Sequence, residues 1–437
     1  MQRRLQLTSC ILSVLTWLSA ASITSAQSDV PDLPSTPFDY VTYAVTNLPE
    51  HYKTTPPFGD AGASNNTPTD NPITNDGATL GRVLFYDTRL SLNDTISCSS
   101  CHTQETGFGD TRQFSVGYVG DLTPRHSMAL TNSVFYESGR FRWDESAETL
   151  EVQCLIPIEA PDEMGLPLDD LRVRLEGTEF YEELFVNAFG DAEVTNDRIA
   201  KALAQFQRAM VSYNAKYDQA FDAGQDGMPN FEAVFSESEI IGQQLFERTP
   251  KSVRCNVCHR TTAFIGTLPH NIGLDATVTD EGAGGGRFKV ASLRNVAVRG
   301  RFMHDGRFQS LEEVVEFYNS GVQESEFVDD LLRINEDPTQ PIEQLKLTEE
   351  EKQGLVDFMH ALTDNQFLND PKFSDPFGPQ VLFGDANLDG SVDMLDIAEF
   401  VNRISNGPYL NEADINQDGV INLLDVQPFV NILTGGN

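Results

Sequence analysis

The chain is poor in basic residues, with 30 lysines and arginines against 66 aspartates and glutamates, which gives a formal net charge of -36 over 437 residues. So acidic a chain repels nucleic acid and anionic lipid, and neither is expected as a partner. Beyond the N-terminal stretch, no run approaches the roughly 18 apolar residues of a membrane helix, so membrane insertion is not expected either. The charge instead favours bound cations or a basic protein partner.

The N-terminus carries a secretory signal pattern. Two arginines precede an apolar run from Cys10 to Leu18, and small residues follow as far as Ala26. This order predicts that residues 1–26 are a signal peptide and that the mature protein is periplasmic, secreted or on the cell surface. A lipid anchor at Cys10 is not expected, because the apolar run follows that cysteine instead of preceding it.

Cysteine is scarce, at six residues, yet four of the five that follow the signal lie in two CxxCH motifs, CSSCH at 98–102 and CNVCH at 255–259. A bare CxxC pair could form a disulfide or half of a zinc site. A histidine directly after the second cysteine, occurring twice in an exported chain, is the attachment signature of c-type haem. We therefore predict two haem c groups, held by the thioethers and axial histidines of Cys98, Cys101, His102, Cys255, Cys258 and His259. The fifth cysteine, Cys154, is predicted to be a buried, inert thiol.

The chain divides into segments of different composition. Residues 27–74 are rich in Pro, Thr, Asn and Asp and predict an extended arm or linker. A first haem domain is expected over 75–235 and a second over 236–373. Strand patterns are scarce, so the fold class is mainly α, with two cytochrome c-like haem domains followed by a small helical calcium-loop module at 380–437.

Helix signals support this division. Helical patterns occur at 169–177 and 197–213 in the first domain. In the second, the capping boxes Ser310 with Glu313 and Thr348 with Glu351 predict helix starts.

The C-terminal segment contains an internal repeat, DANLDGSVDMLD at 385–396 and DINQDGVINLLD at 414–425. One such loop alone could be an ordinary Asx turn, but two copies favour calcium, because oxygen side chains recur at loop positions one, three, five and twelve with glycine at six. The predicted ligands are Asp385, Asn387, Asp389, Asp396, Asp414, Asn416, Asp418 and Asp425. With aspartate at position twelve, the repeat resembles a type I dockerin, which implies two calcium ions and a cohesin-like partner.

Between the haem motifs and after them lie two distinctive stretches, FRWDESAETLEVQCLIPIEAPDEMG at 141–165 and SLRNVAVRGRFMHDGRF at 292–308. Together with both CxxCH motifs they resemble the bacterial dihaem cytochrome c peroxidase and MauG family, and the likeness runs from about Asn75 to Phe373. The resemblance implies an enzyme, a haem-dependent peroxidase or oxidase that acts on hydrogen peroxide.

The resemblance also implies roles for four residues. Glu163 matches the distal acid that moves a proton between the peroxide oxygens, and a partly buried carboxyl has a suitably raised pKa. Gln153 and Pro157 match residues of the same pocket, and Trp143 matches the tryptophan between the haems. Taken alone, Glu163 would be a solvated loop carboxylate and Trp143 a core aromatic. Their joint spacing beside two haem motifs favours the functional interpretation.

One departure from conventional peroxidases concerns the first haem. Those enzymes carry a blocking histidine after the first haem motif, and here Tyr118 stands in its place, which predicts an open or weakly capped first iron. His126 is the nearest alternative ligand. It aligns with the asparagine of the family's calcium site between the haem domains, so that third calcium is in doubt.

A further departure concerns the second haem. The family's distal ligand lies fourteen residues after the HDG histidine, which from His304 is Tyr318. Conventional peroxidases have methionine there and MauG-type enzymes have tyrosine. Tyr318 is therefore predicted as the second-haem ligand, with Met303 as the competitor, although its apolar helical spacing would also suit a core residue.

Three functions compete on these grounds. The first is a MauG-like enzyme that abstracts electrons from a protein or organic substrate, with oxidising equivalents passing through Trp143. The second is a peroxidase that draws electrons from a small cytochrome c or cupredoxin. The third is a non-catalytic dihaem electron carrier anchored by its dockerin-like module. Tyr118 and Tyr318 favour the first.

Overall fold

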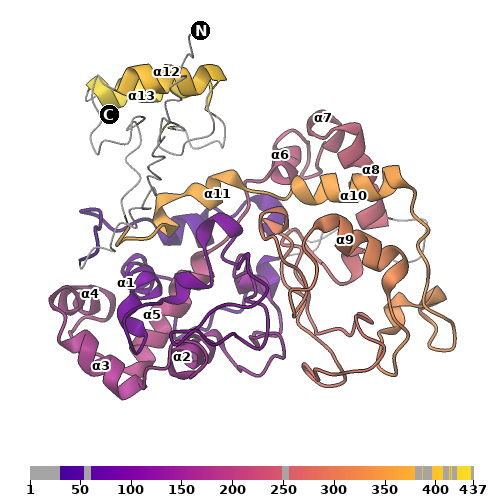
Figure 1. Ribbon diagram of the computed structural model, residues 1–437. Coiled ribbons are helices and arrows are strands. Elements are labelled where there is room, and N and C mark those ends of the chain that lie inside the picture. The colour runs from indigo at the N-terminus through magenta and orange to yellow at the C-terminus, as the bar shows by residue number, and fades with distance from the viewer. Residues whose placement is uncertain are drawn as a thin grey trace, which may run out of the picture.

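The structure is a computed structural model that describes residues 30–53, 61–248, 255–378, 386, 396–406, 413, 415 and 421–434. Helices joined by long loops make up this part of the chain, and its β-structure is limited to isolated bridges (Figure 1). No helix within these ranges is long and apolar enough to cross a membrane. The mainly helical fold predicted from the sequence is therefore confirmed for the described residues.

The first hydrophobic core forms around α5 (Asn196–Ala209), against which α1 (Asn75–Tyr86) and α2 (Leu150–Glu159) pack (Figure 1). The threonines that precede α1 and α5 cap them by accepting backbone N–H bonds, which satisfies groups that a helix start leaves unpaired. Gly81 allows the close approach of α1 to α5, because a Cβ there would lie 2.0 Å from the Ala202 carbonyl oxygen. Two further helices complete this side of the molecule, α3 (Leu168–Glu176) and α4 (Glu179–Phe189).

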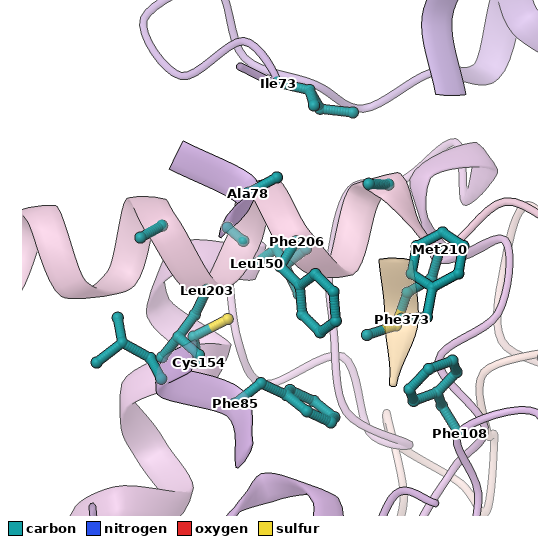
Figure 2. Close-up of a cluster of buried hydrophobic side chains, with 14 of the residues drawn as sticks. Ile73, Ala78, Phe85, Phe108, Leu150, Cys154, Leu203, Phe206, Met210 and Phe373 are labelled. Atoms are coloured by element: carbon teal, nitrogen blue, oxygen red, sulfur yellow. The ribbon is translucent and has the colours of Figure 1, made fainter. Parts of the chain in front are cut away.

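Aromatic rings fill the first core. Figure 2 shows Phe85, Phe206 and Phe373 together with Phe108, and Phe85 packs edge-on to Phe206 and Phe108 at centroid separations of 5.4 and 5.9 Å. Such edge-on pairs are favoured by the charge distribution of the rings. The fifth side chain, Cys154, lies in the same buried cluster. The core thus fixes the loop after the first CxxCH motif through Phe108.

The second core lies between α8 (Glu237–Arg248) and α10 (Glu349–His360), with α9 (Leu311–Glu316) packed on α10. Gly242 and Gly354 face each other at the α8–α10 crossing, where a Cβ on Gly242 would lie 1.8 Å from the Gly354 carbonyl oxygen. The shorter helices α6 (Lys216–Asp222) and α7 (Phe231–Val234) contribute to this core, and α11 (Asn365–Asn369) follows α10.

Several predicted helix signals are confirmed. Helix α3 matches the pattern at 169–177 and α5 covers most of the pattern at 197–213. Thr348 and Glu351 form the complete capping box at α10. Ser310 caps α9 through the Glu313 N–H, but the Glu313 carboxylate accepts the N–H of the preceding residue, Gln309, instead of that of Ser310.

The two cores do not coincide with the predicted segments. Tyr40 and Tyr52, from the predicted arm at 27–74, are fully buried in the first core, so residues 30–53 are a packed part of that unit. Tyr217, expected in the first domain, lies in the second core. Phe367 and Phe373, expected in the second domain, return to the first. Each core therefore includes aromatic residues from a segment that was predicted to belong to the other domain.

In the C-terminal module, α12 (Asp396–Asn406) and α13 (Val426–Thr434) pack together through Phe400 and Phe429, whose ring centroids are 4.0 Å apart. Asp396 and Asp425, which close the two predicted calcium loops, are fully buried. The other predicted ligands, Asp385, Asn387, Asp389, Asp414, Asn416 and Asp418, lie outside the described residues. The helices expected after each loop are confirmed.

Candidate active site

The residues predicted around the first haem line one cavity of about 1380 Å³, counting the solvent at its mouth. It brings together the cysteine thiols and histidine of the first motif with side chains from α2 and the following turn. The predicted residues in its wall are Cys98, Cys101, His102, Trp143, Gln153, Pro157 and Glu163. Segments up to 65 residues apart in sequence therefore converge here as the resemblance implies.

Both motif histidines are oriented by main-chain carbonyls. His102 Nδ1 lies 2.9 Å from the Phe108 oxygen, and His259 Nδ1 lies 3.3 Å from the Phe264 oxygen. A carbonyl only accepts, so Nδ1 carries the proton in each ring and Nε2 keeps its lone pair. Burial lowers the pKa of His102 and brings that of His259 to about 4, which keeps both rings neutral. Each imidazole is thus prepared to bind a metal through Nε2.

Helix α2 and the turn after it place the distal residues. Pro157 lies inside α2 and has no N–H, so the Gln153 carbonyl loses its helical donor. The chain then folds back, with the Met164 N–H donating to the Pro157 oxygen at 3.1 Å. This return brings Glu163 into the wall of the cavity that Gln153 also lines. Burial raises the pKa of Glu163, and the neighbouring Asp162 raises it further.

Tyr118 does not line this cavity. Its ring packs on Gly165, where an added Cβ would lie 2.3 Å from Tyr118 Cε1, and its N–H donates to the Glu163 carbonyl oxygen at 2.8 Å. Gly165 has a φ of +66°, a conformation that favours glycine. The segment that carries Tyr118 therefore supports the turn of Glu163 without lining the cavity.

A second cavity, of about 1190 Å³ on the same measure, contains His259 and both candidate ligands, Tyr318 and Met303. Tyr318 reaches it from a π-helical turn, Phe317–Gly321, that continues α9. Burial is the main cause that raises the pKa of Tyr318, and the thiols of Cys258 and Cys255 add to it. Since Met303 shares the wall, the choice between the two ligands stays a prediction.

The two cavities share a wall in which Trp143 is held by two hydrogen bonds. The Trp143 Nε1–H donates to the His126 carbonyl oxygen at 2.7 Å, and the Lys289 N–H donates to the Trp143 oxygen at 2.9 Å. Arg125 bridges the units beside it through Asp144 and Asp280. The other residues common to both cavities are His126, Met128, Ala129, Lys289 and Ala291. Trp143 therefore lies between the cavities, as the resemblance implies.

His126 offers little support for a calcium ion between the units. Its ring Nδ1 donates to the Arg112 and Gln113 carbonyl oxygens, at 3.1 and 3.3 Å. Among the described residues, no group of three or more His, Cys, Asp or Glu side chains is arranged to hold a metal ion. All five described cysteines are free thiols, and Cys154 is buried, with the Gln207 amide donating to its sulfur at 3.1 Å.

Two buried cations in the cavity walls are not apparent from the sequence. Arg299, 8 % exposed, lines the second cavity, and its Nε has no hydrogen-bond partner. Lys289, 4 % exposed, lines both cavities. Burial lowers the pKa of Arg299 to about 9 and that of Lys289 to about 7. Sequence patterns do not distinguish these two residues from ordinary surface cations.

The residues present fit haem in both cavities. In the first cavity, Cys98, Cys101 and His102 supply two thiols for covalent attachment and a neutral imidazole. In the second, His259 supplies a neutral imidazole from the wall, and the thiols of Cys255 and Cys258 lie near enough to Tyr318 to raise its pKa. Gln153 Oε1 is buried without a partner in the first cavity, and Arg299 is a buried cation that needs an anion in the second. Haem carries carboxylates that would pair with such a cation, and a ligand bound to it would donate to such an oxygen.

Comparison with known proteins agrees with this geometry. Residues 75–226 match the family model described as di-haem cytochrome c peroxidase, and residues 383–433 match the dockerin type I domain. The methylamine utilization protein MauG of Methylophilus methylotrophus is 32 % identical over 303 residues, covering 68 % of this chain and 84 % of that protein. The cytochrome c551 peroxidase of Nitrosomonas europaea is 31 % identical over 257 residues, covering 56 % and 73 %.

A solved structure is also similar. It is a MauG-like protein associated with microbial copper homeostasis, 30 % identical, with a TM-score of 0.62 over 76 % of this chain and 99 % of that one.

Proposed function

Because the chain belongs to the di-haem cytochrome c peroxidase family that includes MauG, we propose that it reduces hydrogen peroxide in the first cavity and exchanges electrons with the second through Trp143. The observation that carries this proposal is the shared wall, in which one tryptophan lies between two cavities that each hold a CxxCH histidine. Haem iron, when bound, supplies the electrons and the coordination position at which peroxide is reduced.

The proposed proton chemistry belongs to Glu163. Its raised pKa lets the carboxyl keep a proton closer to neutral pH than an exposed glutamate does. Breaking the O–O bond of peroxide requires a proton to move from one oxygen to the other, and Glu163 is the acid in the cavity wall that can carry it. Gln153 Oε1, which is buried without a partner, would accept a hydrogen bond from peroxide and orient it.

Electron exchange between the cavities is assigned to Trp143. Hydrogen bonds at its indole N–H and its carbonyl hold the side chain in one position, so its contacts with both cavities persist. Both haem c groups would be held by the motif cysteines and histidines named above. The second iron would take Tyr318 as its other ligand, which favours oxidised states of iron.

The first cavity is proposed to accept peroxide while the protein is fully oxidised, as in MauG-type enzymes. Support comes from Tyr118, which packs on Gly165 outside the cavity instead of entering it. His126 is then the only histidine other than His102 in the described wall of the first cavity, and its Nδ1 donates to main-chain carbonyls, which leaves Nε2 with its lone pair. A blocking imidazole would therefore have to be His126 acting through Nε2, since Tyr118 does not line the cavity.

The substrate is proposed to be an oxidisable protein or organic molecule, with a small cytochrome or cupredoxin donor as the second candidate. The second candidate is favoured by the similarity to a cytochrome c551 peroxidase. The dockerin type I match supports a cohesin-like partner and calcium in the C-terminal module. An exported or periplasmic location follows from the signal pattern at 1–26, which lies outside the described residues.

The test is rapid mixing of the oxidised, haem-loaded protein with one equivalent of hydrogen peroxide, followed by haem absorbance. Glu163→Gln should slow the reaction by about 10²- to 10⁴-fold, the usual contribution of a general acid or base. Glu159→Gln is the matched control, because Glu159 is exposed at the C-terminal end of α2, four residues before Glu163, and lies outside the cavity wall. Its rate should equal that of the unaltered protein.

The outcomes separate the candidate functions. An unchanged rate in Glu163→Gln would favour the non-catalytic electron carrier. Reaction only after one haem has been reduced would favour the conventional cytochrome c peroxidase and contradict the open first site. Fast reaction of the oxidised protein supports the MauG-like function.

A further inference from the structure

A buried tyrosine that the mechanism above does not use is paired with a carboxylate close to Trp143. Tyr136 is fully buried, and its hydroxyl donates to Glu145 Oε1 at 2.5 Å. Ser138 Oγ donates to the same oxygen at 2.9 Å. Burial is the largest cause that raises the pKa of Tyr136, and the bond to Glu145 raises it further. The phenol therefore stays protonated, with Glu145 as its immediate proton acceptor.

The pair lies next to the wall of the first cavity. The Lys289 ammonium nitrogen lies 3.8 Å from the Tyr136 ring centroid and 4.3 Å from that of Phe141, which itself lines the first cavity. The same lysine bonds the Trp143 carbonyl through its backbone. Tyr136 and Phe141 thus flank one ammonium group, so a single side chain separates the tyrosine from the cavity wall.

The backbone of Glu145, whose carboxylate accepts the bond from Tyr136, is strained. Glu145 has a φ of +53°, in the left-handed region that favours glycine. The Arg140 Nε–H donates to its carbonyl oxygen at 2.9 Å and holds the turn. A strained non-glycine residue that over-determined surroundings keep in place is a common mark of a functional site.

We propose that Tyr136 is a redox-active side chain that loses an electron and passes its phenolic proton to Glu145 in the same event. The electron that Tyr136 loses is one of the two that reduce a peroxide molecule (H₂O₂ + 2 e⁻ + 2 H⁺ → 2 H₂O). The products are a neutral tyrosyl radical and a protonated Glu145. An external reductant returns an electron, and the proton moves back to the phenolic oxygen.

In its protonated form Lys289, whose pKa burial lowers to about 7, favours the proton transfer. A cation over the ring opposes a second positive charge there, because the low-dielectric interior strengthens their repulsion. Oxidation without deprotonation would create that charge, whereas transfer of the proton to Glu145 leaves the ring neutral. This inference rests on the proposed peroxide reaction, which supplies the oxidant.

The experiment is rapid freeze-quench electron paramagnetic resonance of the haem-loaded, oxidised protein mixed with one equivalent of hydrogen peroxide, with haem absorbance recorded in parallel. Protein containing ring-deuterated tyrosine should show a narrowed radical signal, which identifies a tyrosyl radical. Tyr136→Phe should lower this signal by about tenfold or more. Glu145→Gln should do the same, because the amide oxygen accepts a hydrogen bond but takes up no proton.

Tyr181 is the matched control. It is fully buried and its hydroxyl donates to Asp87 Oδ2 at 2.7 Å, so its chemistry is that of Tyr136. Its ring packs on Phe180 and Phe185, which line neither cavity, whereas the Tyr136 ring contacts Lys289, which lines both. Tyr181→Phe should leave the radical signal unchanged. If Tyr136→Phe fails to assemble with haem, deuterium narrowing and Glu145→Gln still decide the outcome.

Each result bears on one claim. A radical signal of full intensity in Tyr136→Phe, or one that Tyr181→Phe abolishes, overturns the assignment to Tyr136. Full intensity in Glu145→Gln overturns the coupled proton transfer. Haem absorbance that responds to peroxide without any tyrosyl signal defeats this inference alone, whereas absorbance that does not respond defeats the proposed function as well.

Discussion

Replacing Asp218 by asparagine should destabilise the junction between the two cores by about 3–5 kcal/mol, the usual cost of leaving one member of a buried ion pair alone. The Asp218 carboxylate accepts bonds from Arg294 Nη1 and Nη2 at 2.5 and 2.9 Å, and from the backbone N–H of Ala215 at 2.8 Å. His51 Nε2 lies 2.8 Å away. The Arg294 side chain is fully buried, so asparagine would leave its charge unpaired and out of water.

This change would act on the whole assembly, because the three side chains come from three parts of the chain. His51 belongs to the N-terminal segment, Asp218 to α6, and Arg294 to the loop before α9. The assay is thermal unfolding of the haem-loaded protein followed by circular dichroism. The midpoint should fall by about 6–10 °C, from the usual 2–4 °C per kcal/mol with the lower slope expected for a long chain.

A matched control is Asp169→Asn. Asp169 pairs with Arg172 at 2.9 Å on the surface of α3 and is 86 % exposed. Exposed pairs contribute less than about 1 kcal/mol, so this midpoint should move by no more than about 2 °C. Equal shifts in the two variants would refute the reasoning that burial of Arg294 sets the cost.

The pH dependence provides a second check on Asp218. Burial alone would raise its pKa, but the Arg294 charge and the bond from His51 outweigh burial and hold it below the ordinary value. A carboxyl with a lowered folded-state pKa stabilises the protein above its unfolded pKa of about 3.9, and that stabilisation is lost as pH falls towards the folded value. The difference between the unaltered protein and Asp218→Asn should therefore be constant from pH 7 to 5 and shrink below about pH 4.

Two further predictions concern the metal ligands. Tyr318→Phe should change the absorbance and magnetic spectra of the second haem and raise its reduction potential by on the order of 0.1 V, because loss of an anionic oxygen ligand disfavours ferric iron. Met303→Leu should leave both unchanged, and the reverse pattern would identify Met303 as the ligand. Calcium chelation should lower the helical circular dichroism of the full chain but not that of a chain ended at residue 379, since calcium-loop modules fold with their metal. Equal spectra with and without chelator would contradict calcium binding by the C-terminal module.

Short sequence motifs predicted the haem chemistry, because haem attachment requires particular residue types at fixed short spacing. The family resemblance, which two CxxCH motifs and the order of Trp143, Gln153, Pro157 and Glu163 support, implied that these residues gather around the first motif, and the structure brings them together in one cavity there. The caps at α9 and α10 were similarly readable, since a cap depends on residues three positions apart. Dockerin-like helices were predicted from the repeat for the same reason.

Long-range packing was less accessible. The burial of Tyr40 and Tyr52 turned a predicted arm into part of the first core, because composition alone does not reveal which aromatic rings find partners. Similarly, no pattern assigned Tyr217 to the second core or Phe373 to the first. The need for glycine at positions 81 and 354 is visible only in the tertiary structure, where another backbone passes close to each.

By itself, the sequence predicted the haem attachment sites and the calcium-loop repeat and supported the resemblance to the family, because covalent and coordination chemistry requires particular residue types at fixed short spacing. Only the tertiary structure decided that Tyr118 packs outside the first cavity, that Trp143 lies in the wall of both, and that Lys289 lies between Tyr136 and Phe141. These contacts join residues that are tens to more than a hundred positions apart in the sequence. Burial and close packing determine them, and a local sequence pattern does not extend over that separation.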